Sequence, residues 1–246
     1  MQTTPTEHST TYVGIDGCKS GWFVAILQGE QLRFQLCQTL AEVDARLPRH
    51  SIVFIDMPIG FIEPGEAQRQ CDRLARQALP GRRGSVFPVP CRQAVYADDY
   101  STACGINAAE IGKRFPIQTW HIVPKMREVH QLLQMQPGCH GRYYESHPEL
   151  VFAGFAQAPM AELKSTVAGQ QARLAVIAAQ VPHWLPVIEQ ALSETLKKHA
   201  KPDDIIDAFV LLLAASQPKH WQFLPAVADP DSEGLNRQIV YAPWLN

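Results

Sequence analysis

The sequence lacks the features that mark several specialised classes of protein. Its six cysteines are scattered and form no CxxC pair, so neither a zinc ribbon nor a thioredoxin motif is indicated. The longest apolar run, residues 208–215, is far too short to span a bilayer. Residues 1–10 are polar and contain no apolar signal segment. We therefore expect free thiols, a cytoplasmic location and no membrane association.

An excess of charge of one sign is also missing. Lys and Arg number 22 against 24 Asp and Glu, which gives a net charge of −2 at pH 7. A chain of this balance carries no overall basic field, so strong non-specific binding to nucleic acid is not expected. A local basic groove is still compatible with these numbers.

What the sequence does contain is a series of short apolar runs, typical of an α/β protein. Apolar residues make up 46% of the chain, enough for a sizeable core. Hydrophobic alternation and turn residues predict strands over 12–16, 21–28 and 32–38, followed by a helix over 39–47. The unbroken run 52–55 predicts a strand that is covered on both faces.

The rest of the chain is predicted to be mainly helical. Segment 80–120 is rich in Gly, Pro and Arg and too long for a plain connection, which indicates an insertion or a functional loop. We expect a single domain over 11–246 that contains this insertion, after a disordered tail of residues 1–10. Segment 217–246 is expected to be packed coil. Helices are predicted at 66–78, 124–135, 169–180, 183–199 and 202–216, and a strand at 142–146.

Two aspartates follow apolar strands, and a third interrupts an apolar helix. Asp16 and Asp56 each end a strand and precede a turn former. If the two strands are parallel, both carboxylates lie at the same edge of the sheet, where ligands bind in open α/β sheets. Asp207 is the only polar residue between Ile205 and Ala215. An ionised carboxylate in such a buried helix requires a partner or a metal ion.

Asp204 lies three residues before Asp207, so both project from one face of the helix. Like charges raise each other's pKa, and a cluster of carboxylates is unfavourable unless a divalent cation is bound. Oxygen ligands without His or Cys favour Mg²⁺ or Mn²⁺ over zinc. Two such ions about 4 Å apart can hold the attacking and leaving oxygens of a phosphodiester.

Three of these four acids also have a plain structural explanation. Asp16 before Gly17 is typical of an Asx turn, and Asp56 could accept backbone N–H groups within its own turn. Asp204 suits a helix start, where a carboxylate caps the helix and complements its dipole. Asp207 has no comparable structural role, and for this residue we favour function.

Eight motifs that occur in order carry a resemblance to a known family. They are GIDGCKSGW, IDMPIG, RQCDRLAR, SVFPVP, PKMREV, YESHPEL, the lysine of LKST, and DDIIDAF. Together, over about residues 12–216, they resemble the DUF429 family, whose members are predicted nucleases of the ribonuclease H-like superfamily. The resemblance implies a mixed five-stranded sheet of order 3-2-1-4-5, with strand 2 antiparallel, flanked by helices. The final D-x-x-D-A helix is also similar to that of RuvC-type Holliday-junction resolvases.

The resemblance further implies a metal-dependent nuclease with Mg²⁺ or Mn²⁺ as cofactor and nucleic acid as partner. Asp16 would bridge the metal ions, Asp56 and Asp207 would be further ligands, and Asp204 would complete the helical pair. Glu145 of the ESHPE motif would join the catalytic residues in an open role. A homodimer, as in the resolvases, is allowed, although no basic helix faces the final Asp pair.

Basic residues near these motifs are candidates for substrate binding, although a solvated helix face paired with Glu66 or Asp72 is the favoured explanation for the arginines of segment 66–78. A histidine before proline, as at His147, is more often a loop residue than a ligand. Phe87, between Val86 and Pro88, would either stack on a base or pack the insertion onto the core. The candidates are Arg69, Arg82, Arg83, Lys125, Lys164 and His147.

Two other functions stay open on the sequence alone. Actin-like phosphotransferases share the β-β-β-α-β core and a GID strand, but they require two such domains, and the chain shows one copy of the motif. A non-catalytic binding module would keep the fold and use segment 80–120 to hold a partner. The retained acids argue against the second alternative, because buried carboxylates without a role are costly.

Overall fold

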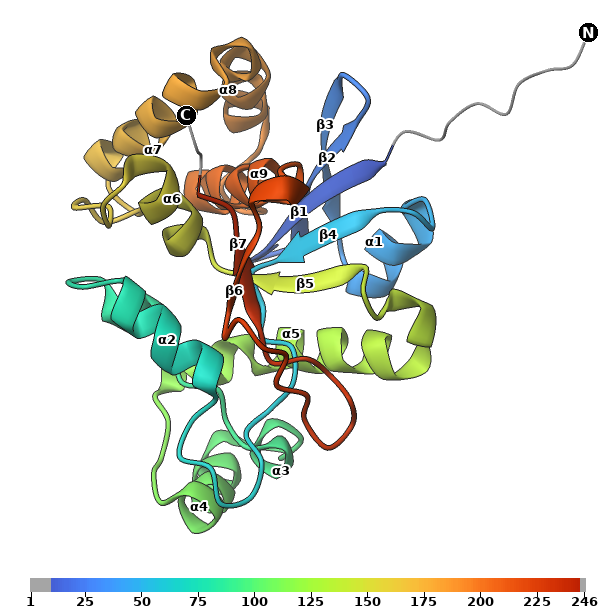
Figure 1. Cartoon of the computed structure of the whole chain (residues 1–246), viewed down its shortest axis with the longest axis vertical. Helices are drawn as coiled ribbons and strands as arrows, with labels where there is room; N and C mark the ends of the chain where they lie inside the picture. The colour runs from blue at the N-terminus through green and yellow to red at the C-terminus, as the bar shows by residue number, and fades with distance from the viewer. Residues whose placement is uncertain (1–9, 244–246) are drawn as a thin grey trace, which may run out of the picture.

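A seven-stranded mixed sheet forms the centre of the protein (Figure 1). The computed structural model describes residues 10–243. The strand order is β3-β2-β1-β4-β5-β7-β6. The strands are β1 (Thr11–Cys18), β2 (Gly21–Gln28), β3 (Gln31–Cys37), β4 (Ile52–Ile55), β5 (Tyr143–Ser146), β6 (Gln222–Leu224) and β7 (Ile239–Tyr241).

The expected order 3-2-1-4-5 is confirmed as part of this larger sheet. Strand β2 is antiparallel to both β1 and β3, whereas β1, β4 and β5 run parallel. The expectation of coil for 217–246 is wrong for β6 and β7, which pair with each other and attach β7 to β5. Each of these strands has three residues, too few for a hydrophobic alternation to be recognised.

Helices cover both faces of the sheet (Figure 1). One face packs on α1 and α5 through a core that includes Val13 and Ile15. The other face packs on α6 to α9 through a core that includes Phe54. The helices are α1 (Leu40–Arg46), α2 (Gln70–Ala78), α3 (Arg92–Val95), α4 (Tyr100–Ile111), α5 (Ile117–Met135), α6 (Pro148–Ala156), α7 (Val167–Gln180), α8 (Leu185–Glu194) and α9 (Pro202–Ala215).

Helix α9 lies directly against β1, and a glycine makes this close approach possible. A Cβ atom on Gly14 would lie 2.0 Å from the carbonyl oxygen of Ala208 and 2.3 Å from the amide nitrogen of Leu212. Every residue of α9 from Ile205 to Ala215 is buried, which agrees with the apolar run in the sequence. The contact fixes the height of α9 above the carboxyl end of β1.

Several predicted helix boundaries are wrong. Segment 80–120 is not irregular throughout, because it contains α3 and α4; Asp99 caps α4 by accepting from the Thr102 amide at 2.9 Å. Helix α5 begins at Ile117 and includes Pro124 in its interior. Proline lacks only its own N–H, and the packing of this long helix on the sheet outweighs that loss. Helix α2 begins at Gln70 and not at 66, and α8 ends at Glu194 and not at 199.

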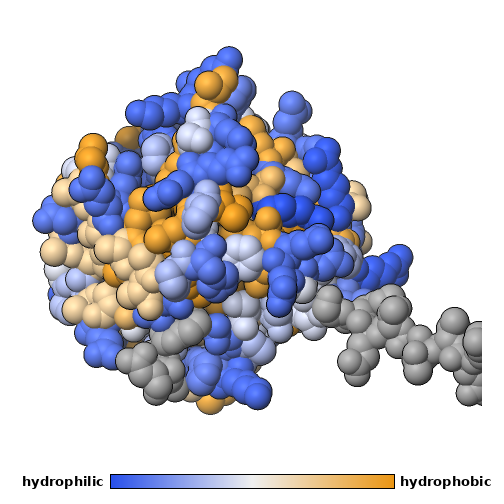
Figure 2. Space-filling view, turned by 90° about the horizontal axis from the view of Figure 1, so that it is seen from above, coloured by the Kyte–Doolittle hydropathy of each residue, from blue (hydrophilic) through white to orange (hydrophobic). Residues whose placement is uncertain are grey.

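All six cysteines are buried and unpaired, as expected. Among residues 10–243, no helix combines the length and apolar character needed to cross a membrane. The tail predicted at residues 1–10 falls, except for its last residue, outside the described part of the chain. Figure 2 shows apolar surface near the middle of the face seen from above, with hydrophilic residues around it.

Candidate metal and substrate site

All five predicted carboxylates, the four aspartates and Glu145, line one pocket of about 330 Å³ at the carboxyl edge of the sheet. The parallel pairing of β1 with β4 ends at Ile15 and Ile55, and the Asp56 amide donates to the Ile15 carbonyl at 2.9 Å. Asp16 and Asp56 therefore stand side by side just beyond the last paired residues. Strand β1 itself continues to Cys18 in its pairing with β2, two residues beyond the predicted end.

The period of two along a strand decides which way these side chains point. Gly14 and Phe54 face α9, so Asp16 and Asp56, two residues further on, face the same helix. Asp207 lies on α9 and is 1% exposed, and Asp204 lies one turn earlier. The strands and the helix thus bring the four aspartates of the predicted site to one pocket.

The electrostatics of the pocket reflect this crowding. The pKa of Asp16 is raised well above its usual range by burial and by the neighbouring charge of Asp56, while Lys164 acts in the opposite direction. Burial raises the pKa of Asp207 to about 6. Burial also raises the pKa of Asp204, whose carboxylate accepts from the Lys201 amide at 2.8 Å and so caps α9.

Lys164 is the cation that faces these acids. Its Nζ lies 2.6 Å from Oδ2 of Asp207. Burial alone would lower the pKa of Lys164, but Asp207, Asp16 and Asp56 raise it well above its usual range. Lys164 and Lys125 carry two positive charges against the four aspartates that line the pocket, so the pocket retains an excess of negative potential when all four are ionised.

The donors of the pocket are carboxylate oxygens, the kind that a hard divalent cation prefers. Among the described residues, no three aspartate ligand atoms of the pocket lie within 4.8 Å of one another, so a shared ion would have to draw them closer together. Oδ1 of Asp207 is buried and has no hydrogen-bond partner. Within the described residues, no side chain or amide donates a hydrogen bond to the carboxylates of Asp16 or Asp56. A buried acceptor without a donor is costly, and a bound cation would satisfy it. Oxygen-only ligands favour Mg²⁺ or Mn²⁺.

Glu145 also lines the pocket, but both of its oxygens are occupied. Arg69 donates to them at 2.7 and 2.8 Å, and the Ile59 amide donates at 2.7 Å. Glu145 pairs in register with Ile55, whose side chain faces α5, so Glu145 lies on the opposite face of the sheet from Asp16 and Asp56. The structure therefore separates Glu145 from the aspartate cluster.

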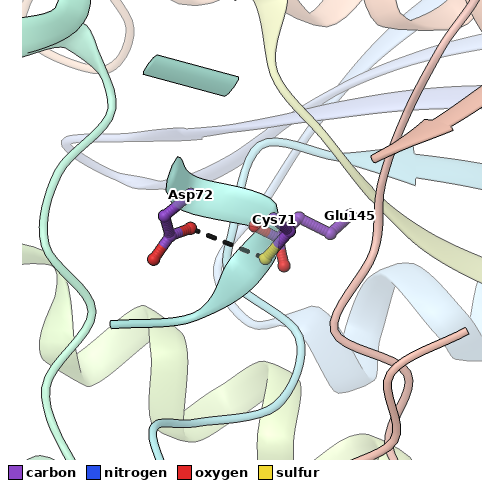
Figure 3. Close-up of side chains that lie close together, drawn as sticks. All are labelled: Cys71, Asp72 and Glu145. Carbon is purple, nitrogen blue, oxygen red and sulfur yellow. Dashed lines mark hydrogen bonds between the residues drawn. The ribbon is translucent and has the colours of Figure 1, made fainter. Parts of the chain in front are cut away.

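A second group of potential ligands surrounds Glu145. Ligand atoms of Cys71, Asp72 and Glu145 lie within 4.8 Å of one another and could hold a metal ion (Figure 3). The guanidinium of Arg69 already donates to both carboxylates, however. Burial also raises the pKa of the Cys71 thiol, which disfavours the thiolate that a metal would need. We therefore assign this group to the internal salt bridge of Arg69.

The predicted substrate-binding residues fall into three sets. Lys164 and Lys125 line the aspartate pocket; Lys125 Nζ donates to the Gly21 carbonyl at 2.6 Å, and its stem packs against Gly17. Arg69, Arg82 and His147 also line the pocket, but each is held by the protein. Arg82 lies 3.3 Å from Glu149, and Nε2 of His147 lies 3.1 Å from the Ser85 carbonyl. Arg83 is exposed and lines a neighbouring hollow.

Of the partners that hold this wall in place, Asp72 was considered from the sequence, whereas Glu149 and Arg173 were missed. Glu149 is 4% exposed and pairs with both Arg82 and the fully buried Arg173 of α7. Asp72 is 1% exposed and pairs with Arg69. Glu149 lies within the YESHPEL motif, which was the available signal for it. No local pattern marks Arg173, because its partner is remote in the sequence.

The sheet and the site together define a mixed α/β protein with an acidic pocket between the carboxyl ends of parallel strands and a buried helix. A family model described as a protein of unknown function (DUF429) matches residues 14–229, which is most of the chain. The chain therefore belongs to the DUF429 family. Comparison with curated proteins and with solved structures gave no significant match.

Proposed function

We propose that this protein is a metal-dependent nuclease that hydrolyses phosphodiester bonds in nucleic acid. The observation that carries the proposal is the convergence of Asp16, Asp56 and Asp207 in one pocket, with a buried Asp207 oxygen that has no partner. Such a cluster is unfavourable in a protein without a bound cation. Its place at the carboxyl edge of parallel strands is where α/β proteins bind substrates.

The residues of the pocket would divide the work as follows. Asp16, Asp56 and Asp207 would hold Mg²⁺ or Mn²⁺, which when bound activates water and stabilises a leaving oxygen. Asp204 stands at the rim and is already committed in part to capping α9. Lys164 and Lys125 place positive charge beside the carboxylates, where it would attract and orient a phosphate group.

One feature favours this proposal over an actin-like phosphotransferase. Within residues 10–243 there is one mixed sheet and one β-β-β-α unit leading into β4, whereas that class requires two such domains. The buried acids likewise favour catalysis over a binding module, because a module without metal chemistry would gain stability by losing them.

The proposal is tested by metal binding and then by cleavage. Calorimetry should show Mn²⁺ binding to the wild-type protein, loss of binding in Asp16→Asn and in Asp207→Asn, and retained binding in Asp98→Asn. Asp98 is exposed and does not line the pocket, so it is a matched control. Wild type should then cut at least one of DNA, RNA, a hybrid or a branched duplex. Cleavage no faster than that of Asp16→Asn on all four substrates would contradict the proposal.

A further inference from the structure

Beside the carboxylate pocket lies a second hollow, of about 600 Å³, whose charged lining residues are basic with one exception. Its one acidic lining residue, Asp72, is already paired with the buried Arg69. Three of its four basic residues are exposed and form no ion pair with any described residue: Arg83, Lys113 and Arg114. This hollow, the basic groove, therefore presents positive charge that the protein does not neutralise. Its basic residues are Arg76, Arg83, Lys113 and Arg114.

The basic groove lies next to the carboxylate pocket. Val86, Phe87 and Val89 line both hollows, so this short segment is the wall between them. Phe87 is 41% exposed, so part of its ring is accessible at the boundary between the two hollows. An aromatic ring at such a boundary offers a flat face to a planar group that passes from one hollow to the other.

Both walls of the groove are held firmly by the rest of the fold. Arg76 donates from Nε and Nη2 to the Val86 carbonyl at 3.2 and 3.0 Å, which anchors the residue before Phe87. On the other side, the buried Asn107 accepts from the Cys91 amide at 2.9 Å and donates to the Lys113 carbonyl at 2.7 Å. The charges and the ring are thus presented on fixed backbone, which lowers the entropic cost of binding.

The depth of the carboxylates restricts what can reach them. Asp16 is 6% exposed and Asp207 is 1% exposed, and the pocket above them measures about 330 Å³. This is the size of a small-molecule site, too narrow for a stacked and paired duplex. A flexible single strand can lower one phosphodiester into the pocket while neighbouring bases stack on an aromatic ring.

We propose that the basic groove is the binding track for a single-stranded nucleic acid whose scissile phosphate enters the carboxylate pocket. Arg83, Lys113 and Arg114 contact the phosphates of the strand, and Phe87 stacks on the base that lies between the two hollows. The proposal rests on the proposed nuclease function and adds to it the substrate class and the direction in which the strand runs from the site.

Binding is measured by fluorescence anisotropy in EDTA, with labelled oligonucleotides of about 12 nucleotides, on the full chain carrying Asp16→Asn so that nothing is cut. We expect a single strand to bind at least about 10-fold more tightly than the duplex of the same sequence. Arg83→Glu/Lys113→Glu/Arg114→Glu should weaken binding at least about 10-fold and reduce the salt slope by about 2. Phe87→Ala should weaken it about 10-fold. Parallel titrations with DNA and RNA oligonucleotides show which of the two nucleic acids is preferred.

A charge-matched control separates the groove from net charge. Arg33→Glu/Arg49→Glu/Lys219→Glu changes three exposed residues that line neither hollow, and should weaken binding by less than about 3-fold. Equal losses in the two triple variants, or duplex bound as tightly as single strand, would overturn the proposal. If wild type and the groove triple variant cleave a substrate equally fast, the proposed role of the groove is wrong while the nuclease proposal stands. Single-strand binding lost only in the groove variant supports it even if no substrate is cut.

Discussion

The carboxyl group of Asp207 holds its proton more tightly in the folded chain than in the unfolded chain. Its pKa is raised to about 6 by burial, whereas an aspartate in an unfolded chain has a pKa of about 3.9. Between these two values the folded state binds more protons than the unfolded state. The contribution of Asp207 to stability is therefore fully present below pH 4 and is lost as the pH rises through about 6.

The first prediction concerns this loss in metal-free protein. The difference in pKa corresponds to a change in the free energy of unfolding on the order of 2–3 kcal/mol. In EDTA, raising the pH from 4.5 to 7.5 should therefore destabilise wild type relative to Asp207→Asn by about that amount. Urea unfolding at both pH values measures it. Parallel pH profiles for the two proteins would show that Asp207 does not titrate in this range.

The second prediction concerns Arg69, whose guanidinium is 1% exposed and joins Asp72 to Glu145. Arg69→Ala leaves two buried carboxylates without a cation, which should cost about 3–5 kcal/mol in urea unfolding. Arg73→Ala, on the same helix and exposed, should change stability by less than about 0.5 kcal/mol. A loss below about 1 kcal/mol in Arg69→Ala would mean that this internal salt bridge adds little.

The acids of the site could be predicted from the sequence, but their pairing could not. Asp16, Asp56 and Asp207 stand out because each polar residue follows or interrupts an apolar run. Arg69 gives no such signal, since its partner Glu145 lies 76 residues away and on another element. The register of β5 against β4 determines that Glu145 faces α5, and register is a property of the folded sheet and not of a local pattern.

At the scale of elements, the contact between β1 and α9 positions the site. The third prediction is that Gly14→Ala is severely destabilising, by several kcal/mol, because the new methyl group would overlap the backbone of α9 at 2.0 Å. Gly105→Ala, in α4 with open space around it, should instead stabilise the protein by about 0.5–1 kcal/mol. Thermal unfolding of both variants tests the pair; a mild effect of Gly14→Ala would show that α9 can move.

Helices and strands with long, clear apolar patterns were predicted from the sequence. Elements that form because of contacts with residues remote in the sequence were not. The first four strands and α9 have apolar runs that a strand or a buried helix requires. Strands β6 and β7 form because β5 offers a free edge, which no property of segment 217–246 reveals. Helix α5 continues through Pro124 because Val123 and Met126 are fully buried against the sheet, so packing outweighed local preference.

At the scale of the whole molecule, the proposed metal site would couple metal binding to folding. The fourth prediction is that Mn²⁺ at about 100 times its dissociation constant stabilises wild type by roughly 2.7 kcal/mol, which raises the unfolding midpoint by roughly 5–10 °C. Metal-free Asp16→Asn should unfold at a higher temperature than metal-free wild type, because one of the mutually repelling carboxylates is gone.

The unfolding midpoint of Asp16→Asn should not change when Mn²⁺ is added, since Asp16 is a ligand in the proposed site. Differential scanning calorimetry of both proteins, each with EDTA and with Mn²⁺, gives all four midpoints. The coupling would be contradicted if Asp16→Asn unfolded at a lower temperature than wild type in EDTA. It would also be contradicted if Mn²⁺ raised the unfolding midpoint of Asp16→Asn as much as that of wild type.

The position of Arg69 limits how far this chain can be shortened. Its guanidinium donates to the carbonyls of Ile59 and Gly60 after β4, to Asp72 on α2 and to Glu145 on β5. A truncated scaffold that keeps the sheet and removes Arg69 together with α2 to α4 would leave the buried Glu145 carboxylate without its cation. Such a minimal version would need an apolar residue in place of Glu145. The segment that begins at Arg69 and the sheet therefore have to be redesigned together.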